Sequence, residues 1–485
     1  MPSPFPLSLS VAPLLLANPI SPKDFFAPLA DTPWAMWLDS CAGMKQSNHI
    51  DAHFDIFVWQ PEATLCTTGN ETTIHFIANN TSLKSEEDPL TLVKKTQQQL
   101  LTALSPSQNS IPFLGGAVGY FSYDLGRRFE KLPARAEHDI NIPEMAIGIY
   151  SQAVIFDHKK QQFFLICPQK KRQEIECFLQ KNVIEQHNKK HMLPPFSLTS
   201  NWQSNMDKPS YVDKFKHVQQ YLLNGDCYQI NLAQRFTASY QGDEFQAYCA
   251  LRQANQAPFS AFLRFEHSAI LSLSPERFLQ LSQGKVQSKP IKGTMPRNSD
   301  KIQDAKNAVL LKNSPKDRAE NVMIVDLLRN DIAKVCQPNS VVVSKLFDVE
   351  SFPAVHHLVS TVEGQLTKKY DACDLLRGAF PGGSITGAPK IRAMEIIETL
   401  EPHRRSVYCG SVGYISTCGT MDTSITIRTL VCKQPLDNKN TNKIYCWAGG
   451  GLVADSTANS EYQETFDKVN CILPILNNIT KNISE

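Results

Sequence analysis

The chain has 485 residues, and its 49 lysines and arginines nearly balance its 47 aspartates and glutamates. Hydrophobic residues make up 42% and charged residues 20%, a globular composition that excludes a disordered chain, a collagen-like repeat and a coiled-coil rod. The formal charge of +2 argues against general nucleic-acid binding, so any anionic ligand must be held by local cations.

The cysteines and the amino terminus indicate the compartment. Thirteen cysteines without C-x-x-C spacing favour reduced thiols over disulfides or a zinc site. The first 20 residues are apolar, but five prolines interrupt them and no lysine or arginine precedes Lys23, which is unlike a signal peptide. No run approaches the ~18 apolar residues of a membrane span. We therefore expect a cytoplasmic protein without a membrane segment.

The amino-terminal half has the patterns of a β-rich domain. Apolar alternation or continuous apolar runs predict strands at 54–59, 73–78 and 147–156, and apolar spacing predicts a helix at 90–104. Residues 185–210 are polar, contain Pro194 and Pro195 and show no periodicity. We interpret them as the connection between an amino-terminal domain, 1–195, and a second domain, 210–475.

The second half has clearer helix signals. Ser210 and Asp213 have the spacing of a capping box before a helix that Gly225 ends. Ser314 followed by Pro315 predicts the start of another helix. Further strands are expected at 227–238, 260–265 and 270–281, and further helices from Pro389 and over 460–472.

A short motif occurs in both halves. Residues 115–124 (GGAVGYFSYD) and 410–416 (GSVGYIS) share the pattern G-x-V-G-Y. Glycine-containing strand segments recur by chance, so two interpretations stay open. The match is a coincidence, or both halves contribute a similar strand to a duplicated architecture.

The segment PGGSITGAPK, residues 381–390, has the composition of an anion site. Gly382, Gly383 and Gly387 allow close backbone approach, and a helix beginning at Pro389 presents unpaired N–H groups to a phosphate or carboxylate. It is not a P-loop, because G-x-x-x-x-G-K-[ST] is absent. A tight strand-to-helix turn without a ligand explains the glycines equally well.

Acidic residues on predicted helices suggest a cation site. Glu461 and Glu464 share a helix face after the glycines at 449–451, while Glu320 lies early in another helix. Carboxylates from separate helices are the usual protein ligands of Mg²⁺. Ordinary ion pairs on a solvated face are the commoner role of such residues, and the spacing does not decide between the two.

A lysine and a glutamate have the character of catalytic groups. Lys292 lies between Ile291 and Gly293 at a predicted strand end, where burial would lower its pKa and make the amine a nucleophile or base. Glu276, sixteen residues earlier, is a candidate general acid. The ordinary position of a lysine is the surface, and the segment alone does not exclude it. Arg428 alternates with apolar neighbours and suits carboxylate capture or a structural ion pair.

Seven motifs, in order, resemble the chorismate-utilising enzymes, a family that includes anthranilate, aminodeoxychorismate, isochorismate and salicylate synthases. The motifs are DCYQINLAQRF, SPERF, PIKGT, DRAENVMIVDLLRNDI, PGGSITGAPK, YCGSVGYI with ITIRT, and AGGGLVADS followed by EYQETFDKV. They span residues 211–472, more than half of the chain. The resemblance implies an α+β fold with two β-sheets packed face to face and helices outside, to which both halves contribute.

Two positions indicate the branch of the family. Anthranilate synthases have alanine in place of Lys292, whereas aminodeoxychorismate synthases have lysine. Isochorismate and salicylate synthases use a lysine at the position of Gln229 to activate water, and Gln229 removes that base. The resemblance thus implies amination of chorismate to 4-amino-4-deoxychorismate, for p-aminobenzoate and folate biosynthesis.

The chain has no G-x-C-x-G nucleophile elbow, so we expect ammonia to come from a separate glutamine amidotransferase subunit. Three alternatives are weighed against amination at C4. They are anthranilate synthesis, an isochorismate or salicylate synthase activity, and a non-catalytic chorismate-binding subunit.

The same resemblance assigns roles to individual residues. Lys292 would add at C2 of chorismate while Glu276 protonates the departing C4 oxygen, and ammonia would then attack C4 and expel the lysine. Glu320 and Glu464 would hold Mg²⁺ against the ring carboxylate, and Glu461 would support that site. The positions that would bind the substrate are Gly293, Thr294, His357, Ser384, Tyr408, Arg428, Gly449, Gly450 and Gly451.

The amino-terminal half matches the family less closely. The segment LDS, which ends at Ser40, stands where relatives have a tryptophan-binding L-E-S segment. Its expected partner is the segment PFS. The resemblance implies a tryptophan site, regulatory or structural, at Ser40, Pro258, Phe259 and Ser260.

Overall fold

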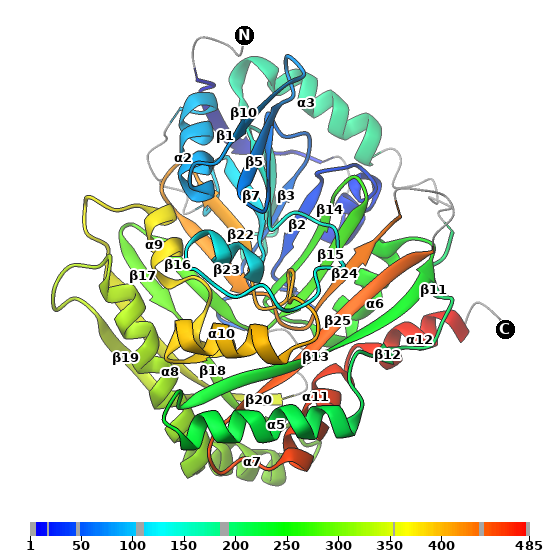
Figure 1. The fold of residues 1–485 in the computed structure, drawn as a ribbon. Coiled ribbons are helices and arrows are strands. Elements are labelled where there is room, and N and C mark those ends of the chain that lie inside the picture. The colour runs from blue at the N-terminus through cyan, green and yellow to red at the C-terminus, as the bar shows by residue number, and fades with distance from the viewer. Residues whose placement is uncertain are drawn as a thin grey trace.

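Two large β-sheets with helices around them form the molecule (Figure 1), as the resemblance predicted. The computed structural model describes the whole chain except residues 1–5, 17–18, 45–48, 103–110, 185–193, 353–354, 436–440 and 482–485. Neighbouring strands run antiparallel in both sheets. The expected α+β class is therefore confirmed.

The first sheet has thirteen strands. In spatial order its path is β1 (Leu9–Pro13), β10 (Gln162–Pro168), β9 (Ala153–Asp157), β3 (Phe54–Val58), β2 (Met36–Asp39), β14 (Phe259–Arg264), β15 (Ser268–Ser274), β24 (Thr429–Lys433), β25 (Asn442–Leu452), β13 (Gln229–Gln241) and β11 (Ser197–Leu198). The short strands β12 (Gln203–Ser204) and β21 (Gly387–Ala388) also pair with β13.

The second sheet has twelve strands. Its path is β18 (Ile291–Pro296), β20 (Val355–Gln365), β17 (Lys285–Ser288), β16 (Arg277–Ser282), β23 (Met421–Ile425), β22 (Ser411–Ser416), β7 (Gly116–Phe121), β8 (Met145–Tyr150), β4 (Ala63–Thr68), β5 (Glu71–Phe76) and β6 (Thr81–Ser85). The strand β19 (Val342–Ser351) pairs with β20.

Helices connect and cover the sheets. They are α1 (Pro22–Phe26), α2 (Pro89–Leu100), α3 (Arg172–Leu179), α5 (Lys208–Leu223), α6 (Glu244–Asn255), α7 (Lys301–Asn313), α8 (Pro315–Ala333), α9 (Ala372–Ala379), α10 (Lys390–Leu400), α11 (Ala458–Val469) and α12 (Leu473–Lys481). None of these described helices is both long enough and apolar enough to cross a membrane.

Each sheet contains strands from both halves of the chain. In the first sheet β2 pairs with β14, so that Trp37 lies opposite Phe262. In the second sheet β7 pairs with β22. Segments 1–195 and 210–475 therefore share their backbone hydrogen bonds, which ties them into one structural unit.

The repeated motif lies at the junction of the second sheet. Its two copies form β7 and β22, and Gly119 of one copy is paired with Gly413 of the other. A Cβ atom on Gly119 would lie 2.0 Å from the carbonyl oxygen of Ala146, and one on Gly413 would lie 2.1 Å from that of Asp422. Both copies thus require glycine for the same close approach of a neighbouring strand, which supports the duplicated interpretation.

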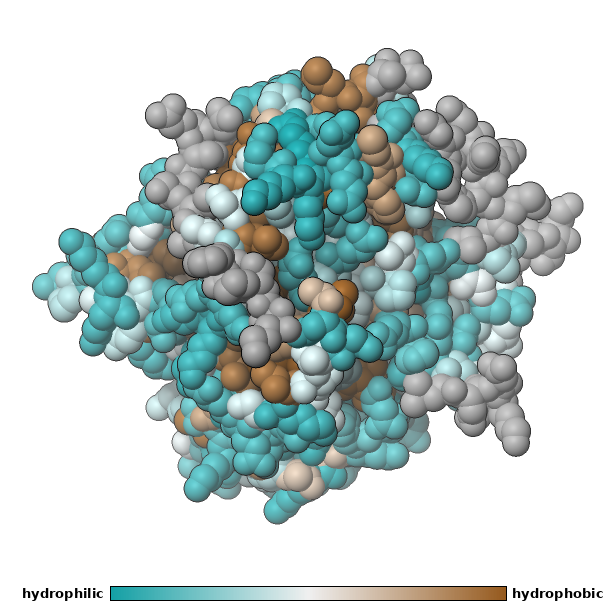
Figure 2. Space-filling view, turned by 90° about the horizontal axis from the view of Figure 1, so that it is seen from above, coloured by the Kyte–Doolittle hydropathy of each residue, from teal (hydrophilic) through white to brown (hydrophobic). Residues whose placement is uncertain are grey.

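Three apolar clusters stabilise the molecule, and the two largest bury most of the two sheets. One joins side chains of both sheets, such as Ile56 and Val58 from the first and Leu65 from the second. Phe57, between the first two, belongs to the other cluster, which includes Phe245 of α6. This alternation follows from the period of two in a strand and buries both faces of the first sheet. Most of the surface seen from above is hydrophilic, and apolar side chains appear there in small separate groups (Figure 2).

The stretches 147–156 and 270–281, each expected as one strand, contain two strands each, β8 with β9 and β15 with β16, and the two strands of each pair lie in different sheets. The helix predicted from Ser210 begins at Lys208, because the carboxylate of Asp207, and not Ser210, caps it by accepting the Ser210 N–H at 2.9 Å. The apolar start of the chain contains β1, which pairs with β10. Ser314 caps α8 as predicted, accepting the N–H of Asp317.

All thirteen cysteines lie among the described residues, and all are free thiols.

Candidate active site

A glutamate and a lysine meet at the glycine-rich segment. Glu276 lies between β15 and β16, and Lys292 is the second residue of β18. The Ser384 hydroxyl donates to Glu276 Oε1 at 2.7 Å, and Lys292 Nζ donates to the Ser384 carbonyl oxygen at 3.3 Å. The segment 381–390 thus acts as a bridge that brings an acid and an amine, remote in sequence, to one place.

The environment favours the neutral form of both groups. Burial raises the pKa of Glu276 to about 7, although the hydrogen bond from Ser384 and the charge of Lys292 act in the opposite direction. Desolvation lowers the pKa of Lys292, against the attraction of Glu320. A carboxyl group that keeps its proton near neutral pH can serve as an acid, and a neutral amine can serve as a nucleophile.

Three glutamates lie close to these groups on two helices. A Cβ atom on Gly450 would lie 2.9 Å from Glu461 Oε2 and 3.4 Å from Glu464 Oε1. Lys316 Nζ lies 4.0 Å from both Glu320 and Glu461, which joins α8 to α11. Burial raises the pKa of Glu320 and of Glu461, and a neighbouring carboxylate raises each pKa further. Acidic groups that repel one another in this way favour a cation between them.

Two lysines that contact these glutamates were not predicted from the sequence. Lys468 Nζ lies 2.6 Å from Glu464 and donates to the carbonyl oxygen of Gly449 at 2.7 Å. Lys316, described above, pairs with Glu320. Each lysine is four residues from its glutamate, a helical spacing that could have identified both.

A tighter group of potential metal ligands lies elsewhere. Among the described residues, His49, Asp51 and Glu350 are the group of three whose ligand atoms lie within 4.8 Å of one another. Lys289 Nζ lies 2.7 Å from Asp51 and 2.6 Å from Glu350, and Arg277 also pairs with Asp51. These cations already neutralise the carboxylates, so we do not interpret the group as a metal site.

The glycines of β25 leave space beside the lysine. A Cβ atom on Gly451 would lie 2.5 Å from Gln229 Nε2 and 3.5 Å from Lys292 Nζ. The Gln229 side chain is fully buried, and neither its nitrogen nor its oxygen has a hydrogen-bond partner among the described residues. Gly293 has a φ of +82°, and a Cβ there would lie 2.9 Å from the side chain of Asp317. Only glycine fits these positions without displacing a neighbour.

Polar and aromatic residues complete the site. Thr294 Oγ1 and His357 Nδ1 are 2.8 Å apart across the pairing of β18 with β20. Burial and the nearby charge of Arg428 lower the pKa of His357 to about 3, so the imidazole is neutral at pH 7. Tyr408 is buried and stacks on Trp447, two residues before the glycines of β25, with ring centroids 6.0 Å apart.

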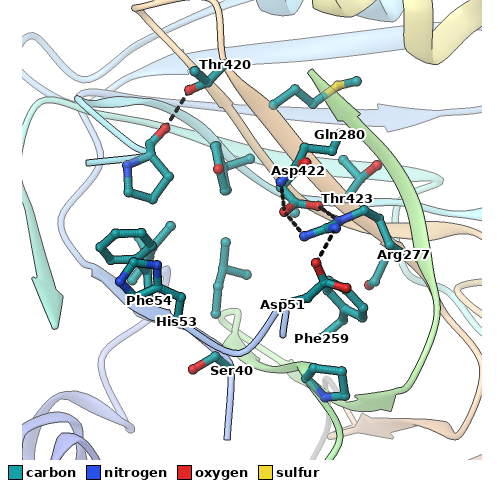
Figure 3. A pocket seen from close by; sticks show the side chains of 18 of the residues that line it. Ser40, Asp51, His53, Phe54, Phe259, Arg277, Gln280, Thr420, Asp422 and Thr423 are labelled. Atoms are coloured by element: carbon teal, nitrogen blue, oxygen red, sulfur yellow. Dashed lines mark hydrogen bonds and ion pairs between the residues drawn. The ribbon is translucent and has the colours of Figure 1, made fainter. Parts of the chain in front are cut away.

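A cavity lies beside the pairing, in the first sheet, of β2, from the amino-terminal half of the chain, with β14, from the second half (Figure 3). Its volume is about 470 Å³. It is lined by all the residues of the predicted tryptophan site: Ser40, Pro258, Phe259 and Ser260. The Ser40 hydroxyl donates to Asp55 at 2.7 Å, and the Ser260 hydroxyl donates to the carbonyl oxygen of Ala257 at 2.8 Å. The aspartates and arginines on the wall are Asp39, Asp51, Arg277 and Asp422.

Known proteins resemble this chain over most of its length. The family model of the chorismate binding enzymes matches residues 36–474. Aminodeoxychorismate synthase component 1 of Klebsiella aerogenes is 53% identical over 470 residues, which cover 96% of this chain and 99% of that protein. Its counterpart in Escherichia coli strain K12 is 52% identical over 450 residues, covering 93% and 94%. The crystal structure of anthranilate synthase component I from Streptococcus pneumoniae TIGR4 has a TM-score of 0.74 and 31% identity, covering 89% and 94%.

Proposed function

The chain belongs to the family of chorismate binding enzymes, and on that premise we propose that it aminates chorismate at C4 to give 4-amino-4-deoxychorismate. The relatives at 53% and 52% identity, named aminodeoxychorismate synthase component 1, support this activity and its place in p-aminobenzoate and folate biosynthesis. The observation that carries the proposal is the partly neutral pair of Glu276 and Lys292, joined through Ser384. A non-catalytic protein that only bound chorismate would need neither a nucleophile nor an acid.

Two allylic displacements connect this pair to the product. The Lys292 amine forms a bond to C2, both conjugated ring double bonds shift by one position, and the C4 oxygen leaves as water with the proton of Glu276. Ammonia then forms a bond to C4, both double bonds return, and the lysine leaves C2. The ammonium formed at C4 loses a proton, which the Glu276 carboxylate accepts, so both side chains regain their starting state.

We propose that the residues around Glu276 and Lys292 orient the substrate. Chorismate carries two carboxylates, and we assign their binding to Arg428, Thr294 and the backbone N–H groups of the glycines at 449–451. Ser384 keeps Glu276 directed at the leaving oxygen, and Tyr408 limits the space above β25. The low pKa of His357, about 3, keeps this residue a neutral hydrogen-bond partner in the site.

We assign Mg²⁺ to Glu320, Glu464 and Glu461. Oxygen donors from two helices suit this ion, and Lys316, at 4.0 Å from both Glu320 and Glu461, is too far from either to hydrogen-bond to it. Bound there, Mg²⁺ would supply positive charge beside a substrate carboxylate. The three glutamates place negative charge close to Lys292. Glu320 and Glu464 raise the pKa of Lys292, whereas burial lowers it.

Ammonia, in this proposal, comes from a separate glutamine amidotransferase subunit. The words "component 1" in the relatives' names support a second component, and the chain lacks the nucleophile elbow of a glutaminase. The thirteen free cysteines support the expected cytoplasmic compartment.

An assay with ammonium salt tests the function without a partner. The purified chain, given chorismate, Mg²⁺ and ammonium chloride, should form aminodeoxychorismate, identified by mass and by chromatography. Anthranilate with pyruvate as the product would instead assign the chain to anthranilate synthesis. Isochorismate or salicylate would show that water, and not ammonia, is the nucleophile.

We also propose that the cavity in Figure 3 binds tryptophan. Ser40, Pro258, Phe259 and Ser260, the residues that the resemblance implied, all line it. Isothermal titration should detect binding of tryptophan to the wild-type chain and weaker binding to Ser40→Trp, which would fill the cavity. Titration without heat in the wild-type chain would refute the site.

A further inference from the structure

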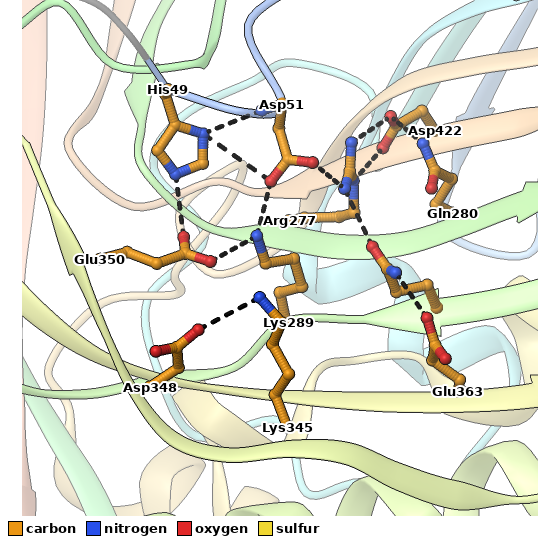
Figure 4. A network of polar contacts seen from close by, with 11 residues as sticks. His49, Asp51, Arg277, Gln280, Lys289, Lys345, Asp348, Glu350, Glu363 and Asp422 are labelled. Carbon is orange, nitrogen blue, oxygen red and sulfur yellow. Dashed lines mark hydrogen bonds and ion pairs between the residues drawn. The ribbon is translucent and has the colours of Figure 1, made fainter.

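Charged side chains form a network (Figure 4), and two of its members, Asp51 and Arg277, also line the cavity. We call it the Asp51 network: Asp51, Arg277, Lys289, Glu350 and His49. Asp51 accepts from Arg277 at 2.7 Å with one oxygen and from Lys289 at 2.7 Å with the other. Lys289 Nζ also lies 2.6 Å from Glu350, which contacts His49 Nε2 at 2.9 Å.

The members of the network are chain neighbours of the catalytic candidates. Arg277 directly follows Glu276, and Lys289 precedes Lys292 by three residues. One carboxylate, that of Asp51, therefore holds the strand ends that present both the acid and the amine. Asp51 itself lies in the amino-terminal half, in a loop that contributes no residue to the proposed chemistry.

The local backbone explains why such a link is needed. The strands β17 and β18 both pair with β20, from Lys285 opposite Gln365 to Pro296 opposite Val355. Lys289 and Pro290 lie between these two strands, and the pairing of β18 shifts register between Ile291 and Thr294, on either side of Lys292. A single long hydrogen bond, from the Ser360 N–H to the Pro290 carbonyl oxygen at 3.3 Å, holds the backbone there, and the ion pairs of Lys289 add a second restraint.

A second arm of the network reaches the substrate-binding histidine. Glu350 lies opposite His357 in the pairing of β19 with β20. His49 stacks on Phe352 at 4.7 Å, and Phe352 contacts His357 edge to face at 5.0 Å. The network thus adjoins β16, β18 and β20, the strands that present Glu276, Lys292 and His357.

The network is largely shielded from water, and its charged groups are paired with one another. The Arg277 side chain is 4% exposed, that of Lys289 10% and that of Asp51 14%. Arg277 is held in addition by a two-fold contact with Asp422, at 3.1 and 3.0 Å. Charge-assisted hydrogen bonds in such a setting have a fixed geometry, and loss of one partner leaves a buried charge unpaired.

We infer that Asp51 is a positioning residue for the amination of chorismate, holding Glu276 and Lys292 at their working separation through Arg277 and Lys289. This inference rests on the proposed function. A displacement of about 1 Å between reacting groups costs on the order of 10²-fold in rate. Loss of Asp51 should therefore lower kcat and leave KM for chorismate nearly unchanged, because Asp51 lies outside the substrate-binding groups.

The test compares Asp51→Asn, Asp51→Glu and a matched control in the ammonium-dependent assay. Asp51→Asn keeps the size of the side chain but removes the charge shared by the two cations. We expect its kcat to fall about tenfold or more, with KM for chorismate within about twofold of the wild-type value. Asp51→Glu restores the carboxylate and should recover part of the lost kcat.

The control is Asp139→Asn, which breaks a comparable two-fold ion pair, at 2.7 Å to both nitrogens of Arg235. Its kcat should stay within about twofold of wild type even if its thermal stability falls. An Asp51→Asn enzyme with wild-type kcat, or one that loses kcat no more than the Asp139→Asn enzyme, would overturn the inference.

A second variant keeps the inference testable if Asp51→Asn does not fold. Lys289→Met removes one arm and leaves Asp51 paired with Arg277, and its kcat should also fall about tenfold while Lys289→Arg retains more activity. Unchanged kcat in Lys289→Met would refute the positioning role. A wild-type chain that forms no aminodeoxychorismate would refute the proposed function instead, so the two failures are distinguishable.

Discussion

Replacing Glu276 with glutamine should remove the basic limb of the pH–rate profile. The pKa of Glu276, raised by burial to about 7, means that about half of these side chains carry a proton at pH 7 and about one tenth at pH 8. The protonated form is the acid, so its contribution to the rate is near its maximum at about pH 6 and falls about tenfold for each pH unit above about pH 8. Lys292 acts in the opposite sense, because its neutral form increases with pH.

Glutamine keeps the local geometry and loses only the proton. Its amide oxygen can still accept the hydrogen bond that the Ser384 hydroxyl gives to Glu276 at 2.7 Å. We expect kcat to fall about 10²- to 10⁴-fold, the usual contribution of a general acid, and the remaining rate to be flat or to rise above pH 7.

The assay is the ammonium-dependent formation of aminodeoxychorismate, measured from pH 6 to pH 9 with free ammonia held constant. Ser384→Ala is the matched control. In the wild-type chain the Ser384 hydroxyl lowers the pKa of Glu276. Removing this hydroxyl should therefore shift the basic limb to higher pH without abolishing it. A Glu276→Gln enzyme that keeps both its rate and its basic limb would show that another group donates the proton.

Three other changes are expected to have separate effects. Lys292→Ala should lower kcat by about 10²-fold or more while thermal unfolding stays near wild type, and unchanged turnover would make Lys292 a bystander. EDTA should abolish the ammonium-dependent activity and Mg²⁺ restore it, whereas indifference to the chelator would remove Glu320 and Glu464 from the metal role. Gly450→Ala places a Cβ 2.9 Å from Glu461 and should raise the Mg²⁺ concentration needed for half-maximal rate, in a titration of activity against Mg²⁺.

Local signals predicted the helices because caps and periodicity act over a few residues. Ser314 and Pro315 marked the start of α8, since both act within the first turn. The same rules misplaced the start of α5, where Asp207 and Ser210 are both good caps and only the surrounding packing selects the first.

Motif resemblance pointed to the proposed site residues but not to their environment. The pKa of Glu276 depends on burial and on the Ser384 hydroxyl, 108 residues away in the chain. Lys316 and Lys468 were missed because a lone lysine four residues from a glutamate is common on solvated helices. The Asp51 network was also beyond prediction, since its members come from three distant parts of the sequence.

The sequence by itself determined the family, the approximate positions of the helices and the repeated G-x-V-G-Y motif, because each depends on residues within short segments of the chain. Only the tertiary structure decided that Gly119 and Gly413 pair in one sheet, and that Glu276, Ser384 and Lys292 meet. The physical reason is that pairing register, burial and electrostatic shifts depend on which distant segments come into contact. The near-neutral net charge of +2 conceals these local charges, which the fold gathers at the active site and around Asp51.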